Sequence, residues 1–457
     1  MTIAFLAVLA LAALFLGLAR GRARTLAAGD PASLHSRPAY HGLYVFLRVV
    51  VIGWLILLFG ATALHYIVDQ ALLARISAAQ PDIAEIQAQL ILSDAKAIAE
   101  GRISSKTGEL RSQIAADFQW LNSLRVVGTI LVALATAAAI GGLNLGRITK
   151  DLRARNRAES YIQYLLLASA TIAILTTIGI VLSLVFETIN FFSSIGWRID
   201  KYLFGTTWSP LSGVQSGAMD ANKVGAVPLF LGTFMITLIA MLVAVPVGLF
   251  SAIYLSDFAS TRVRAWAKPM LELLAGIPTV VYGFFAAITI APALRGFGDT
   301  VGLSIASESA LAAGLVMGIM IIPFISSLSD DVISAVPQAL RDGSYGLGAT
   351  KAETIRQVVL PAALPGIVSA VLLGISRAIG ETMIVVMAAG QGANLTFNPL
   401  EAVTTVTVQI VMLITGDTDA ATAAGPAFTL GFTLFCMTLL MNVFALRLVR
   451  KYREAYD

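Results

Sequence analysis

The sequence contains little of what most soluble proteins and enzymes depend on. It has one cysteine, Cys436, which excludes an intrachain disulfide, and its three histidines show no metal-ligand spacing. Only 13% of its 457 residues are charged, whereas about a quarter are charged in a typical soluble domain. It contains no P-loop pattern, so this chain has no Walker-type ATP site, and no cluster of nucleophile or His–carboxylate residues indicates an intramembrane enzyme.

Apolar residues are abundant instead. Hydrophobic residues make up 57% of the chain and the mean hydropathy is +0.83, which is too much for a soluble core and predicts a membrane protein. A membrane-spanning helix needs about 20 apolar residues. Nine runs qualify or nearly do: about 2–19, 43–67, 125–146, 161–192, 227–254, 268–294, 306–327, 363–390 and 426–448.

The placement of Lys and Arg predicts the orientation of these helices. They gather in loops 20–42, 147–160 and 255–267 and in the C-terminal tail, which share one side if nine helices alternate. Loop 391–425, on the other side, contains neither. By the positive-inside rule, we expect a multi-pass protein with its N-terminus outside and its C-terminus inside.

We expect the chain to divide near residue 150. Residues 1–150 would form an extension of about three spanning helices that carries a polar insert at 68–124. The insert has apolar residues at helical spacing, which favours one or two amphipathic helices outside the membrane. A solvated helical hairpin and a docking module both fit it. Residues 151–457 would form a core of six spanning helices.

Segment 336–361, "VPQALRDGSYGLGATKAETIRQVVLP", is long for an inside loop between spanning helices. Thr350 and Glu353 form a capping-box pattern, which predicts a helix start. Pro361 marks a predicted helix end. An ordinary amphipathic connector and a docking element both fit the segment.

Two ionisable residues, Arg377 and Glu381, lie inside the apolar run 363–390. In one continuous helix they would share a face, one turn apart. One interpretation is a self-neutralising pair that helps helices pack. The other is an anion station near the membrane midplane, because intramembrane charges are usually functional and Arg matches phosphate oxygens.

Three polar residues are candidates for further lining of a path. Thr279 and Tyr282 follow Pro278, which breaks the run 268–294, and breaks in spanning helices often line cavities. Thr382 follows Glu381 directly. A packing kink at Pro278 is an equally good interpretation of the first pair.

The segment 336–361 resembles the EAA motif of ABC importer permeases in its spacing. Asp replaces Glu and Gly-Ser replaces Ala-Ala in this chain. The resemblance implies a short coupling helix that docks into a cleft of an ATPase subunit. Its residues here are Asp342, Gly343, Ser344, Gly348, Val358, Leu360 and Pro361.

The resemblance extends over roughly 161–457. "KPMLELLAGIPTVVYGFF" and "SRAIGETMIVVMAAG" are similar to the permeases of the phosphate transport (Pst) family, and more to the PstC-like than to the PstA-like subunit. This implies an all-α membrane protein whose six-helix core is a type I ABC importer transmembrane domain. In that family, an Arg and a Glu at the positions of Arg377 and Glu381 are implicated in transport.

The family resemblance also implies partners and a location. The chain would be a non-catalytic subunit of a phosphate importer in a bacterial inner membrane, with no cofactor of its own. Two ATP-binding subunits would hydrolyse ATP. The other expected partners are a PstA-like permease, a periplasmic phosphate-binding protein and membrane lipids, and no binding of nucleic acid is expected. Alternatives are a permease for another oxyanion, a proton-coupled anion carrier that uses Glu381, or a membrane scaffold or sensor.

Overall fold

The computed structural model describes residues 2–28, 30, 33–81, 85–102, 108–212, 220–416 and 420–453. Within these residues the chain forms helices and loops, and its one β-bridge joins Trp208 and Val224. Two compact units divide at residues 175 and 176, inside helix α5 (Ala154–Ser194), whereas the sequence places the division near residue 150. We describe each unit by itself.

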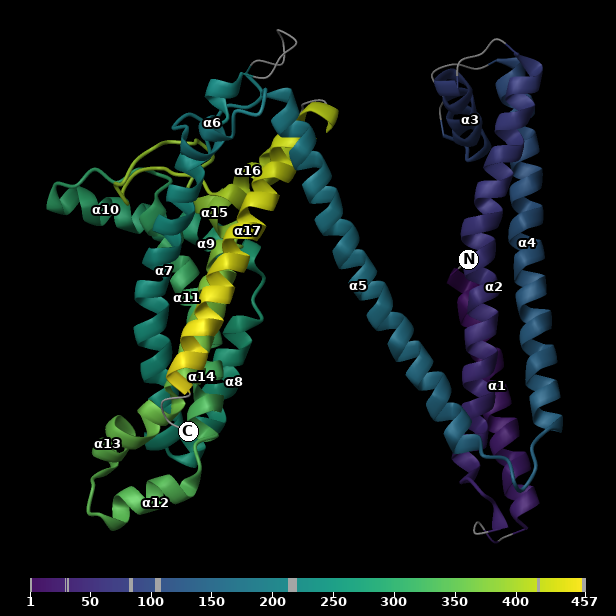
Figure 1. Ribbon diagram of the computed structural model, residues 1–457, viewed down its shortest axis with the longest axis horizontal. Coiled ribbons are helices and arrows are strands. Elements are labelled where there is room, and N and C mark those ends of the chain that lie inside the picture. Colours follow the sequence, from purple (N-terminus) through teal and green to yellow (C-terminus); the bar gives the residue numbers. More distant parts are fainter. Residues whose placement is uncertain are drawn as a thin grey trace. The chain divides into compact units, whose positions relative to one another are not determined.

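Unit 1 consists of long helices that lie side by side. Helices α1 (Thr2–Ala27), α2 (Pro38–Ala79) and α4 (Glu109–Gly146) pack against one another along their lengths (Figure 1). Small residues permit this close packing. A Cβ added at Gly60 of α2 would lie 2.2 Å from a methyl carbon of Thr129 on α4.

The described parts of the polar insert 68–124 are largely helical, as its periodicity predicts, but about half of the insert extends two of the spanning helices. α2 continues to Ala79, α4 begins at Glu109, and α3 (Glu85–Ala99) packs against both. Apolar side chains form a small core between them: Leu72, Ile76, Ala88, Ile91, Leu92, Ala95, Ile114, Ala115 and Phe118. Residues 82–84 and 103–107 of the insert lie outside the described residues.

Unit 2 contains more and shorter elements. They are α6 (Ile199–Phe204), η3 (Ala221–Lys223), α7 (Val227–Ile253), η4 (Tyr254–Phe258), α8 (Thr261–Ala275), α9 (Thr279–Phe285), η5 (Ala286–Ile290), α10 (Ala291–Val301), α11 (Ala310–Ser334), α12 (Gln338–Gly346), α13 (Lys351–Thr354), η6 (Ile355–Val359), α14 (Leu360–Ile379), α15 (Met383–Ala388), α16 (Val406–Thr415) and α17 (Ala420–Arg453). Helices α12 and α13 lie at one end of the bundle, and α10 runs crosswise near the other (Figure 1).

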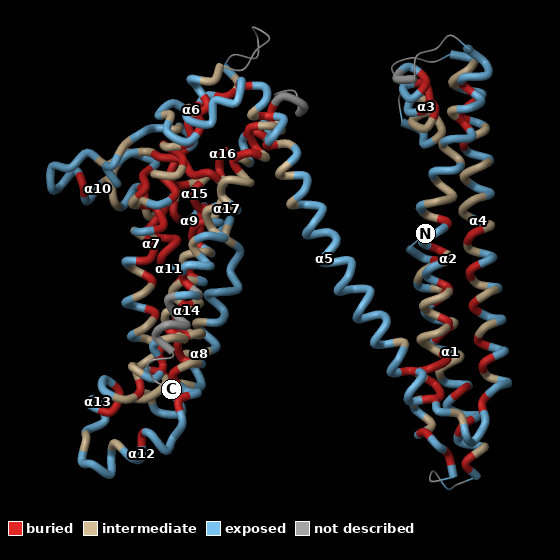
Figure 2. The backbone as a smooth tube through the Cα atoms, in the orientation of Figure 1, coloured by how far each residue is buried: buried red, intermediate tan, exposed pale blue. Residues whose placement is uncertain are grey.

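The core of unit 2 centres on the pair α7 and α11. Gly314 and Gly318 of α11 face α7 so closely that an added Cβ would lie 2.7 Å from Ile239 Cβ and 2.9 Å from the Ala240 carbonyl oxygen. Buried residues gather where α7, α11, α15 and α16 meet (Figure 2). This packing holds α11 rigidly beside the helices that carry the candidate site.

Among the described residues, nine helical stretches are long and apolar enough to cross a membrane, which confirms the predicted all-helical membrane fold. Two of the predicted runs differ in detail. The run 268–294 is interrupted between Ala275 and Thr279, and the run 363–390 is interrupted after Ile379. The loop 391–425 also contains a short apolar helix, α16, which charge counting alone did not predict.

Candidate functional site

Arg377 lies in the last turn of α14, beside the middle of α11. Its guanidinium carbon is 5.7 Å from the ring centroid of Phe324 on α11, a distance that permits a cation–π contact. The side chain is exposed, and it makes no hydrogen bond or ion pair with any described residue. Its hydrogen-bond donors are therefore available at the depth of a spanning helix.

Glu381 does not share a helix face with Arg377, so that prediction is wrong. Helix α14 ends at Ile379, and no ion pair within 4.0 Å joins the two side chains in the described part of the chain. Instead, Glu381 Oε1 accepts hydrogen bonds from the backbone N–H groups of Met383 at 3.0 Å and Ile384 at 3.4 Å. The carboxylate thus caps α15, because the first N–H groups of a helix lack partners within the helix.

The interruption between α14 and α15 is held by its own contacts. Thr407 of α16 donates a hydrogen bond from Oγ1 to the backbone oxygen of Glu381 at 3.0 Å. Thr382 is half-buried, and its hydroxyl is 3.4 Å from the Gly380 carbonyl oxygen. Side chains therefore form hydrogen bonds with backbone groups that the end of α14 leaves unpaired, as a break within a membrane requires.

The second interruption, before α9, explains why Tyr282 is a polar residue in an apolar run. Pro278 has no N–H, so the carbonyl of Leu274, four residues earlier, lacks its helical partner. The Tyr282 hydroxyl donates to that carbonyl at 2.8 Å, and the side chain is buried. Tyr282 therefore stabilises the break. Thr279, half-buried, stands at the start of α9.

The predicted coupling segment forms α12 and α13 at one end of unit 2. Asp342 on α12 is exposed and accepts a hydrogen bond from Gln338 at 3.0 Å. Ser344 Oγ lies 2.9 Å from Thr354 Oγ1, which ties α12 to α13. An added Cβ at Gly343 would meet no atom within 4 Å, whereas Gly348 has φ +90°, a conformation that favours glycine.

Of the two helix signals predicted after Gly348, the helix start at Thr350 is confirmed and the helix end at Pro361 is wrong. The capping box of Thr350 and Glu353 is present. Pro361 does not end a helix: it is the second residue of α14, which continues directly from the π-helical turn η6, and Val359, the last residue of that turn, has helical dihedrals. Val358 and Leu360 are half-buried, and Leu360 packs against the small core beneath the segment.

Sequence reasoning missed the residue that anchors this segment. Arg341 of α12 forms an ion pair with Asp257 of η4, and the two side chains are only 10% and 7% exposed. Arg341 also donates to the Ile333 carbonyl at 2.9 Å. The partners are far apart in the sequence, so nothing in the local pattern indicated the pair. Leu347, 92% exposed, was missed as well.

Asp330 is buried near the end of α11 that leads into α12. Its side chain is only 4% exposed and pairs with Arg264 and Lys268 of α8, two partners distant in the sequence. Asp331 is 64% exposed, as expected for a solvated residue. No group of three His, Cys, Asp or Glu side chains is placed to hold a metal ion in the described ranges.

Two family models match the chain. The model described as "Phosphate ATP-binding cassette transporter" matches residues 3–176, and "Binding-protein-dependent transport system inner membrane component" matches residues 244–454. The first of these covers the N-terminal region, where sequence reasoning found no resemblance.

Named relatives agree with these models. A Bacillus subtilis protein named "Probable ABC transporter permease protein YqgH" is 33% identical over 60% of this chain and 85% of its own length. "Phosphate transport system permease protein PstC" of Xylella fastidiosa is 32% identical over 66% of this chain and 94% of its own. A solved bacterial ABC transporter involved in alginate import is 14% identical, over 65% of this chain and 98% of the solved one, with a TM-score of 0.45. By the family models and the named relatives, the chain belongs to the PstC-like permeases of the phosphate transport (Pst) family of ABC importers.

Proposed function

We propose that the chain is the permease subunit that forms half of the path for inorganic phosphate in an ATP-driven importer. The proposal rests mainly on one observation: Arg377, a charged side chain in a spanning helix, has no ionic partner among the described residues. A guanidinium presents a planar fork of donors that matches phosphate oxygens, and it stays charged. Phosphate would therefore bind where α14 is interrupted.

Glu381 tunes this station. Its Oε1 caps α15, while its Oε2 has no hydrogen bond to a described residue. Phosphate keeps a proton near neutral pH, so it can donate a hydrogen bond to such an oxygen. The negative charge also weakens the attraction for the anion, and transport requires release as well as binding.

The segment α12–α13 docks an ATPase subunit in this proposal. Its surface combines the EAA-like positions with exposed apolar side chains at Leu340, Tyr345 and Leu347, which suit a cleft on a partner protein. Two ATP-binding subunits would hydrolyse the ATP, and this chain itself would carry no cofactor and no catalytic residue. A PstA-like permease and an external phosphate-binding protein complete the complex.

The proposed assembly implies an orientation for the chain. The α12–α13 segment and the C-terminus would face the cytoplasm, where ATP is available, and the N-terminus would face the periplasm. The loop charges support the same arrangement, because the basic loops then lie inside.

The test is uptake of labelled phosphate into vesicles that contain the full complex. Uptake should require hydrolysable ATP, persist with a protonophore present, and resist competition by sulfate. Uptake that collapses with the protonophore while ATP is held constant would contradict the proposal and favour a proton-coupled carrier.

A further inference from the structure

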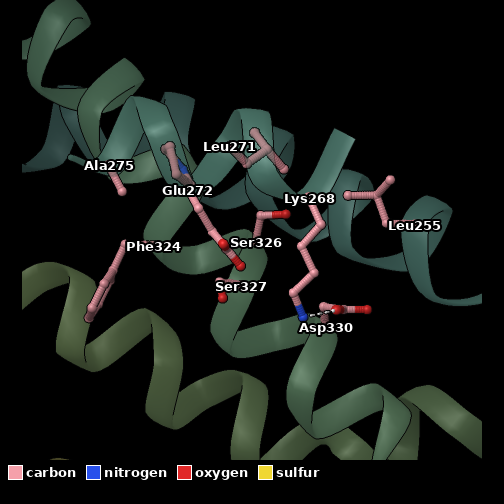
Figure 3. A pocket seen from close by; sticks show the side chains of 10 residues that line it. Leu255, Lys268, Leu271, Glu272, Ala275, Phe324, Ser326, Ser327 and Asp330 are labelled. Carbon is pink, nitrogen blue, oxygen red and sulfur yellow. Dashed lines mark hydrogen bonds and ion pairs between the residues drawn. The ribbon is translucent and has the colours of Figure 1, made fainter. Parts of the chain in front are cut away.

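A second polar site lies between α8 and α11, separate from Arg377 and Glu381. It is a cavity of about 220 Å³ lined in part by Lys268 and Glu272 of α8 and by Ser326, Ser327 and Asp330 of α11. Figure 3 shows Glu272 extending from α8 toward the two serines, and Lys268 reaching Asp330. At about 30 Å³ for each water, this space holds a tetrahedral oxyanion together with several waters.

The serines of the cavity have unused hydrogen-bonding capacity. Ser326 is 1% exposed, and its hydroxyl oxygen is buried without a hydrogen-bond partner in the described structure. The hydroxyl of Ser327 likewise makes no hydrogen bond to a described residue. Buried polar groups are nearly always paired, so an unpaired hydroxyl at a cavity wall indicates a ligand that is absent here.

The charged residues suit a ligand that both accepts and donates hydrogen bonds. Lys268 is 2.9 Å from Asp330 and 3.4 Å from Asp331, and Arg264 shares Asp330 at 3.0 Å. Glu272 is exposed and makes no ion pair or hydrogen bond within the described ranges. An unpaired carboxylate at this depth is expected to face water, which places the cavity on an aqueous route.

One side chain, Phe324, lies between the cavity and Arg377. Phe324 lines the cavity, and the same ring lies 5.7 Å from the Arg377 guanidinium. Asp330 lies nearer the end of α11 that leads into α12. In space, the side chains of Arg377, Phe324 and Lys268 therefore follow one another from the interruption after α14 toward the α12–α13 end of the bundle.

We propose that this cavity is an exit station for a protonated tetrahedral oxyanion, which Lys268 and the serines bind as donors and Glu272 binds as an acceptor. The inference rests on the proposed phosphate transport. The carboxylates of Asp330, Asp331 and Glu272 outnumber the two cations Lys268 and Arg264 by one, so the station holds an anion weakly and lets it leave. A fully deprotonated oxyanion such as sulfate cannot donate to Glu272 and is repelled by it.

The experiment measures protection of a cysteine at the cavity wall. In a Cys436→Ser background, Ala275→Cys places the only cysteine of this chain beside the cavity, and Ala293→Cys at an exposed position of α10, outside the cavity lining, is the control. The full complex in nanodiscs is treated with a small charged thiol reagent, and modification of this chain is followed by mass spectrometry. Millimolar phosphate should slow modification at position 275 at least threefold, whereas sulfate should not, and position 293 should not respond.

Further variants separate this station from Arg377. Lys268→Gln and Ser326→Ala should each abolish the protection, and Arg377→Gln should retain it, because phosphate present on both sides of a nanodisc need not pass Arg377 to reach the cavity. Protection that survives Lys268→Gln, that disappears in Arg377→Gln, or that sulfate reproduces would overturn the proposal. So would an absence of protection in a complex that imports phosphate, whereas a wild-type complex without ATP-driven uptake would refute the proposed function itself.

Discussion

The two units of this chain use helices in opposite ways. In unit 1, α1, α2 and α4 run for 26, 42 and 38 residues with no proline in their interiors. In unit 2, five helices contain an interior proline, at Pro246, Pro269, Pro323, Pro365 and Pro426, and three π-helical turns interrupt the bundle. Interruptions of this kind cluster at functional sites in membrane proteins.

Two arginines show what this difference means. Arg48 lies in the spanning helix α2 of unit 1, and its Nη1 donates to Tyr44 at 3.0 Å and to Asn144 at 2.9 Å, so neutral neighbours hold this nitrogen, whereas Nε is buried without a described partner. Arg377 of unit 2 lies 5.7 Å from the Phe324 ring and makes no hydrogen bond or ion pair with a described residue. In the regular helices of unit 1, Arg48 thus serves to hold neighbouring helices together. In unit 2, Arg377 lies at the end of an interrupted helix and has donors available to bind an anion.

The largest effect should come from Arg341→Ala, which removes the anchor of α12. It leaves Asp257 buried without a partner, and breaking a buried ion pair costs about 3–5 kcal/mol. We expect the complex to lose its ATPase subunits and phosphate uptake to fall to background, measured by co-purification and vesicle uptake.

Two further variants check this explanation. Arg356→Ala, an exposed cation nearby, should assemble and transport normally, and adding Asp257→Ala to Arg341→Ala should restore part of the assembly. Normal assembly of Arg341→Ala alone would show that the ion pair does not hold the segment.

Glu381→Gln should have the next largest effect. Gln keeps an oxygen that can cap α15 but loses the charge, so thermal stability should not change. We expect uptake to slow about tenfold, which corresponds to about 1.4 kcal/mol in the barrier. An unchanged uptake rate would make Glu381 a helix cap and nothing more.

Gly318→Ala tests whether the packing of α7 and α11 supports the site. Its Cβ would lie 2.9 Å from a backbone oxygen, so the helices must separate, at a cost of about 1–3 kcal/mol. Melting in detergent should occur at a lower temperature. Gly128→Ala in α4 of unit 1 has open space and should melt no lower than the wild type. Equal melting temperatures for the two variants would contradict the packing described here.

The smallest effect should come from Asp69→Asn in unit 1. Asp69 and Lys96 pair at 2.8 Å, and Asn keeps an oxygen that can accept a hydrogen bond from Lys96, so the substitution should change little. Uptake per assembled complex should match the wild type in the same vesicle assay. A loss of half the uptake or more would place unit 1 in the transport cycle and break the contrast between the units.

The sequence predicts the spanning helices well because their length and apolar character are local properties. It predicts the interruption at Pro278, since proline lacks the N–H that a helix needs. It misses the end of α14 at Ile379, because "IGETM" contains no proline and continues an apolar run. The separation of Arg377 from Glu381 follows from that missed boundary.

Contacts between distant segments explain the other differences. Arg341 meets Asp257 and Asp330 meets Lys268 only after the bundle has formed, so no spacing along the chain indicates either pair. Asp330 beside Asp331 suggests a solvated edge from the sequence alone. Its burial depends on α8 packing across α11.

The most direct test of the account compares the two arginines in one assay. Arg377→Gln and Arg48→Gln would each be assembled into the full complex, matched for ATPase subunit content, and assayed for ATP-driven uptake of labelled phosphate into vesicles. The account predicts background uptake for Arg377→Gln and nearly normal uptake for Arg48→Gln. Persistent uptake in an assembled Arg377→Gln complex would contradict it and place the anion station elsewhere.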